Sequence, residues 1–165
     1  MADSSEPEPR HPETGREESE PERLDRNLEE LLGELRVALP GVQVLFAFLL
    51  VVPFNQRFAD ITSFQETVYL ATLLCATAAC VCLIAPTAHH RIEFRHQDKR
   101  RIVFGATRLA IVGLTLLALA MTGAVTFVTD FLYGPTTVTI VAVSVALLFA
   151  LLWYAIPIRR LLDDR

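Results

Sequence analysis

Long hydrophobic stretches without a charged side chain dominate the chain from residue 37 to residue 158. Each of the four stretches reaches the roughly 20 residues that an α-helix needs to cross about 30 Å of hydrocarbon. We therefore predict a transmembrane domain at 37–158, with spanning helices at about 37–56, 66–88, 102–129 and 134–158.

A leucine stripe precedes the first of these stretches. Its members recur at helical spacing within residues 23–36, and charged residues occupy the other faces: Leu24, Leu28, Leu31, Leu32 and Leu35. This pattern predicts an amphipathic helix that either lies in the membrane interface or docks on the bundle.

Residues 1–22 have a different character. They hold eight acidic residues against two arginines, several prolines and no aromatic side chain. Such a segment cannot bury enough apolar surface to offset the entropy lost on ordering. The predicted fold class is thus all-α integral membrane, with four transmembrane helices preceded by an amphipathic helix and a disordered acidic N-terminal tail.

Lysine and arginine are distributed unevenly around the spans. The segment from His89 to Arg101 contains five, and more flank the first and last spans, whereas the two other connections contain only Arg57. The positive-inside rule then places both termini, including a tail at 159–165, and the central loop in the cytoplasm. In this orientation the expected aromatic belts are Tyr69, Phe131 and Tyr133 outside, and Trp153 and Tyr154 inside.

The run from Glu34 to Leu50 carries a family resemblance, together with Pro53-Phe54, Arg57-Phe58, Val68-Tyr69-Leu70, Ala85-Pro86, His90-Arg91 and Phe94. These residues resemble an uncharacterised family of small four-helix membrane proteins, a domain of unknown function found mainly in actinobacteria. The resemblance covers about residues 28 to 135 and is most specific from Gln43 to Phe48, although Pro40 stands where the family has a polar residue. It implies the bacterial inner (plasma) membrane, and some members bear an automatic label of sodium/proton antiporter.

Arg108 is the one formal charge that must enter hydrocarbon. Its guanidinium either extends back to the cytoplasmic headgroups or joins an inward-facing site with Gln43, which we expect at comparable depth, a site that could also include Glu34. Threonines follow Arg108 along one helix face, which could line a pore or bind a neighbouring helix. The candidate polar membrane site comprises Arg36, Gln43, Arg108, Thr115 and Thr122.

Charged residues near the outer ends of the spans form a second candidate site: Arg57, Asp60, Glu66 and Asp130. We expect interfacial ion pairs, and alternatively Glu66 as a cation or proton acceptor. Coupled transport usually places an ionisable group near the midplane, yet no Asp or Glu lies deep in any span, which argues against the antiporter label.

The central loop forms a basic patch that we expect to bind anionic lipid headgroups: His90, Arg91, Arg95, Lys99, Arg100 and Arg101. His89, Glu93 and His96 could share one helical face and offer ligands to a metal. The surrounding positive charge would repel a cation, so neither a metal nor a cofactor is predicted.

Small residues form stripes on the second and third spans: Ala71, Cys75, Ala78, Ala79 and Cys82, and Ala106, Ala110, Gly113, Ala120 and Ala124. They should allow helices to pack closely against one another, within a protomer or between protomers. Among the prolines, Pro53 frees the carbonyl of Leu49 for a Gln, Asn or ion, whereas Pro86 and Pro157 should mark helix ends.

No nucleophile with an adjacent base, phosphate-binding loop or zinc-finger spacing occurs, so we do not expect an enzyme or a nucleic-acid partner. The favoured function is a non-enzymatic structural or regulatory membrane component that forms a homo-oligomer or binds another membrane protein. The alternative is an ion or small-solute channel or transporter, for example for a cation or protons.

Overall fold

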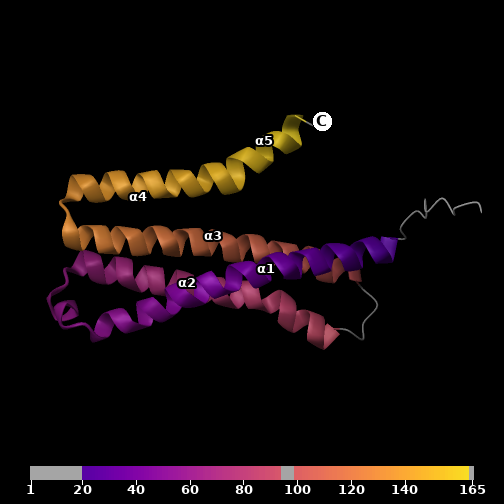
Figure 1. Cartoon of the computed structure of the whole chain (residues 1–165), viewed down its shortest axis with the longest axis horizontal. Helices are drawn as coiled ribbons and strands as arrows, with labels where there is room; N and C mark the ends of the chain where they lie inside the picture. The colour runs from indigo at the N-terminus through magenta and orange to yellow at the C-terminus, as the bar shows by residue number, and fades with distance from the viewer. Residues whose placement is uncertain (1–19, 94–98, 164–165) are drawn as a thin grey trace, which may run out of the picture.

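The computed structural model describes residues 20–93 and 99–163, and every regular element in them is helical. The long helices are α1 (Glu20–Val51), α2 (Ser63–Glu93), α3 (Lys99–Leu132) and α4 (Pro135–Ala150) (Figure 1). Two short 3₁₀ helices, η1 (Val52–Phe54) and η2 (Gln56–Asp60), connect α1 to α2, and a π-helical turn, η3 (Leu151–Ala155), leads from α4 into α5 (Ile156–Asp163).

Four segments are long and apolar enough to cross a membrane: Glu22–Phe54, Ser63–Ala88, Phe104–Leu132 and Pro135–Ala155. This confirms, for the described residues, the predicted all-α class with four membrane-spanning helices. The chain is a multi-pass membrane protein. Residues 1–19 of the predicted acidic tail lie outside the described residues, and its last three residues belong to α1.

Helices α1, α2 and α3 all pack against one another, whereas α4 contacts α3 and, in the described residues, neither α1 nor α2. One end of the bundle holds η1, η2 and the turn between α3 and α4, and we call it the turn end (Figure 1). The opposite end, the terminal end, holds the start of α1, the end of α2, the start of α3 and α5. Successive long helices therefore run in opposite directions.

The core is a narrow seam whose buried positions recur at alternating spacings of three and four residues. On α2 these positions are Gln65, Tyr69, Thr72, Ala76, Ala79, Leu83 and Pro86, and on α3 Ala106, Ala110, Gly113, Leu117 and Ala120. On α1 every seventh residue is buried: Leu28, Leu35, Val42 and Leu49. A seven-residue repeat keeps one helix face toward its neighbour and is typical of left-handed helix packing.

The leucine stripe of residues 23–36 and the first span form one continuous helix, α1, where the sequence suggested two elements. Leu28 and Leu35 are buried at the same seven-residue spacing as Val42 and Leu49, so a single helix can bury all four against the bundle. The sequence allowed this segment either to lie in the membrane interface or to dock on the bundle, and in the structure it docks on the bundle. Pro40 lies within α1 on its exposed side.

The prediction that Pro86 ends its helix is wrong, because α2 continues through Pro86 to Glu93. The chain likewise stays helical across Pro157, which lies in α5. The π-helical turn η3 immediately precedes that proline. Because Pro157 has no N–H for the carbonyl of Trp153, a local widening of the helix accommodates the missing hydrogen bond.

Candidate functional site

A hydrogen-bonded cluster at the turn end links the start of α2 to the end of α3. The backbone N–H of Thr62 donates to Gln65 Oε1 at 3.0 Å, and the backbone N–H of Gln65 donates to Thr62 Oγ1 at 3.2 Å. The remaining Gln65 group, Nε2, donates to Asp130 Oδ2 at 2.9 Å. Gln65 is buried and thus caps its own helix while binding the neighbouring one.

Only Asp130 of the predicted outer charges belongs to this cluster. Arg57, Asp60 and Glu66 are exposed at the same end, and their side chains make no ion pair within residues 20–93 and 99–163. The structure therefore does not bring the four charges together. Sequence reasoning missed Gln65, although the spacing Thr62-x-x-Gln65 is the signature of a capping box.

Next to this cluster, a buried tyrosine joins α2 to α1. The hydroxyl of Tyr69 donates to the backbone carbonyl of Leu49 at 3.0 Å. This is the carbonyl that Pro53 leaves without its helical donor, so the predicted free oxygen exists and its partner is a phenol. Tyr69 is only 8% exposed, so its predicted place in the outer aromatic belt is wrong.

Aromatic rings surround Tyr69 in the core. The ring of Phe58 lies edge-on to it with centroids 5.1 Å apart, and the ring of Phe127 lies 5.8 Å away on the α3 side. Phe127 in turn contacts Phe131 at 5.2 Å. This aromatic group fixes η2, α2 and α3 to one another at the turn end.

The residues of the candidate polar membrane site do not converge. Arg36 and Gln43 are exposed on α1, and Arg108 is exposed on α3. Glu34 lines a pocket together with Thr107, so Arg108 lies near the level of Glu34. Gln43 is about 14 Å of helix rise farther toward the turn end, and the expected common depth of Gln43 and Arg108 is not found.

The threonines that follow Arg108 are hydrogen-bonded within α3. Thr115, Thr122, Thr126 and Thr129 each donate their hydroxyl to the carbonyl four residues earlier, at 2.7 to 2.8 Å. Thr115 also contacts the hydroxyl of Tyr154 in η3, with the oxygens 2.5 Å apart. This face of α3 therefore has no free hydroxyl donor along its length, and at Thr115 it meets the C-terminal helical segment.

The pocket that holds Glu34 lies between α1 and α3 at the terminal end. It has a volume of about 370 Å³ and is lined by Leu24, Asn27, Glu30, Leu31, Glu34, Phe104 and Thr107. Glu30 forms an exposed ion pair with Arg26 at 3.7 Å. The pocket thus opens beside the charged face of α1 that the amphipathic pattern indicated.

The stripe of small residues on α3 is buried as far as Ala120, as the sequence predicted for a helix contact, with Ala106, Ala110 and Ala120 no more than 3% exposed, whereas Ala124 is half-buried. The matching stripe on α2 differs from the expected one. Of the residues predicted there, only Ala79 is fully buried, and Ala71 is exposed. The buried positions are Thr72, Ala76, Ala79 and Leu83.

Two glycines set the distance between α2 and α3. A β-carbon added to Gly113 would lie 2.7 Å from the side chain of Leu83, and one added to Gly123 would lie 3.2 Å from Thr72 Cβ. Both distances are too short for a side chain to be accommodated without movement. The α2–α3 pair is therefore packed at the closeness that only glycine allows.

The basic patch lies at the terminal end. His90 and Arg91 belong to the last turns of α2, and Lys99, Arg100 and Arg101 to the first turn of α3, whereas Arg95 lies outside the described residues. His96 of the possible metal site is also outside them. In the described ranges no three His, Cys, Asp or Glu residues form a group that could hold a metal ion.

The fold and these side chains define a class, a small multi-pass α-helical membrane protein with a hydrogen-bonded core and polar residues on its outer face. Within that class, a model of the family of unknown function DUF6328 matches residues 17–157, and the chain belongs to this family. The resemblance to an uncharacterised four-helix family is thereby confirmed. No curated protein and no solved structure matches the chain.

Proposed function

We propose that this protein is a non-enzymatic structural or regulatory component of the bacterial inner membrane that self-associates or binds a membrane partner. One observation carries the proposal. In the described part of the chain, no buried side-chain nitrogen or oxygen lacks a hydrogen-bond partner, whereas Gln43 and Arg108 are exposed and have none. The polar groups left to interact therefore face outward.

The interior of the bundle supports this proposal rather than transport through one protomer. Ala76, Ala79 and Leu83 are 0% exposed on α2 and pack into a continuous seam. The hydroxyls of Thr122 and Thr126 donate to the backbone of α3 itself, and no Asp or Glu occurs in residues 37–56, 67–90, 109–129 or 131–158. An ion crossing such an interior would find few groups to replace its hydration shell.

The proposed orientation places the terminal end in the cytoplasm. That end carries Lys99, Arg100 and Arg101 at the start of α3, and the turn end carries Arg57 as its single basic residue. Basic residues close to a span are retained on the cytoplasmic side and attract anionic headgroups. We therefore propose anionic lipids as one binding partner of the terminal end.

Ion flux across proteoliposomes tests the proposed function. Vesicles with the purified protein should stay as tight to protons and Na⁺ as protein-free vesicles, with gramicidin-treated vesicles as the positive control. The variant Arg108→Leu should change assembly or stability without changing that tightness. A flux present in the wild type and lost in both Arg108→Leu and Glu66→Gln would reject the proposal in favour of a channel or carrier.

A further inference from the structure

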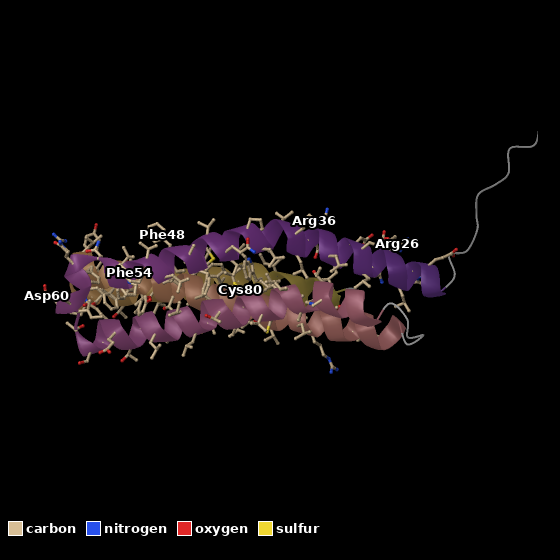
Figure 2. All side chains as sticks on the ribbon, turned by 90° about the horizontal axis from the view of Figure 1, so that it is seen from below. Arg26, Arg36, Phe48, Phe54, Asp60 and Cys80 are labelled. Carbon is tan, nitrogen blue, oxygen red and sulfur yellow. The ribbon has the colours of Figure 1, made fainter. Side chains whose placement is uncertain are left out.

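The outward side of α1 has a second set of positions at alternating spacings of four and three residues. We call these positions the α1 outer seam: Arg36, Pro40, Gln43, Ala47 and Leu50, all of them exposed. Arg36 projects away from the other helices on the outer edge of α1 (Figure 2). The buried positions of the same helix, Leu28, Leu35, Val42 and Leu49, already pack against the rest of the bundle.

Gln43 occupies the middle of this seam and lies deep in the membrane-spanning segment. About 16 Å of helix rise separates it from Phe54, roughly half the thickness of a hydrocarbon layer. Its carboxamide forms no hydrogen bond within residues 20–93 and 99–163. An amide without a partner is costly in hydrocarbon, because no water is present to satisfy it.

We propose that the α1 outer seam is the contact surface for a second copy of this chain, with the two Gln43 carboxamides hydrogen-bonded to each other across a two-fold axis. This inference rests on the proposed function and names the partner that it left open. A carboxamide carries both a donor and an acceptor, so it is complementary to itself, and a two-fold axis along the membrane normal brings each seam residue to its own copy.

The side chains that flank Gln43 suit a close contact between two helices. Pro40 and Ala47 are the next members of the seam on either side of Gln43, and both have short side chains. Small residues of this kind allow backbones to approach in lipid, where packing and hydrogen bonds replace the hydrophobic driving force. Arg36 lies at the membrane boundary, where its long side chain reaches the headgroups and avoids its copy.

Disulfide cross-linking in native membranes tests the seam with a matched pair of positions. Single cysteines at Ala47→Cys and Phe48→Cys are compared in a background where Cys75, Cys80 and Cys82 are alanine. The two sites share one depth, both are exposed, and they differ by about 100° around α1. Oxidation with copper phenanthroline should produce a covalent dimer several-fold faster at Ala47→Cys. Equal rates, or faster cross-linking at Phe48→Cys, would contradict the proposal that the α1 outer seam contacts a second copy.

A second measurement tests the hydrogen bonds between the two Gln43 side chains independently of the contact between the two α1 helices. Gln43→Leu removes an unpaired polar group from lipid, so the protomer should fold at least as well as the wild type. Its dimerisation, measured by single-molecule photobleaching in lipid, should weaken by about threefold to thirtyfold if hydrogen bonds are lost. Unchanged dimerisation would reject the amide pair. Wild-type protein that bleaches only in single steps would reject self-association, whereas proteoliposome flux would reject the proposed function even if the seam cross-links.

Discussion

The hydroxyl of Tyr69 on α2 donates to the backbone carbonyl of Leu49 on α1, at 3.0 Å, in a buried position near the turn end. Pro53 deprives that carbonyl of its ordinary helical donor. A sequence feature that weakens one helix is thus compensated by a side chain of the next. The bond also fixes the relative height of α1 and α2.

Replacing Tyr69 by phenylalanine should destabilise the protein by about 1 kcal/mol, because the buried Leu49 carbonyl loses its donor while the ring remains. Reversible unfolding in mixed micelles measures the change. Tyr133→Phe is the control, since Tyr133 is 60% exposed. If Tyr133→Phe loses as much stability as Tyr69→Phe, the assigned role of the Tyr69 hydroxyl is contradicted.

Adding a methyl group at Gly113 should force α2 and α3 apart. The new β-carbon would lie 2.7 Å from Leu83, so we expect Gly113→Ala to cost about 1 to 3 kcal/mol in the same unfolding measurement. Gly105→Ala on the same helix meets nothing within 4 Å and should be neutral or stabilising by up to about 1 kcal/mol. Similar effects of the two substitutions would show that the α2–α3 contact is looser than described.

Removing the Asp130 carboxylate should leave Gln65 Nε2 without its acceptor. Because Gln65 is buried, Asp130→Ala should cost about 1 to 2 kcal/mol, and Asp130→Asn, which keeps an acceptor oxygen, should cost less. Asp60→Ala serves as the control, because Asp60 is exposed and forms no ion pair in the described residues. If Asp60→Ala and Asp130→Ala are equally costly, the cluster does not act as described.

The contact between Thr115 and Tyr154 should couple α3 to the segment that follows α4. A double-mutant cycle with Thr115→Val and Tyr154→Phe should give a coupling of about 0.6 kcal/mol, the typical value for a hydrogen bond between membrane helices. The matched cycle uses Thr126→Val with Tyr154→Phe, since Thr126 donates to its own helix as Thr115 does but forms no hydrogen bond with Tyr154 in the described residues. A coupling near zero for the first pair would argue that the two hydroxyls do not meet in lipid.

The number of membrane-spanning helices and the all-α class could be predicted from the sequence, because length and hydrophobicity alone set them. The contact face of α2 could not. In water, polar residues mark the exposed face of a helix, but in lipid the exposed face is apolar too, so Leu74 outside and Leu83 inside look alike. The small-residue stripe was consequently placed partly on the wrong positions, although Ala79 was among them.

The arrangement of the candidate site residues could not be predicted, because it depends on how separate helices pack and no single segment of the sequence contains that information. The height of Gln43 relative to Arg108 is set by how α1 and α3 dock, and this follows from packing along both helices. The pairing of Gln65 with Asp130 likewise joins residues far apart in the chain. The sequence contained local signals for only two features of the candidate site. These are the capping box that begins at Thr62 and the Leu49 carbonyl that Pro53 leaves without a helical donor.

Reporter fusions test most directly the proposed arrangement, a four-span bundle whose terminal end lies in the cytoplasm. Green fluorescent protein fused after Lys99 should fluoresce and alkaline phosphatase fused there should be inactive, whereas fusions after Tyr133 should give the reverse. Phosphatase activity at Lys99 with fluorescence at Tyr133 would contradict the orientation. The same reporter active at both positions would contradict the four spans.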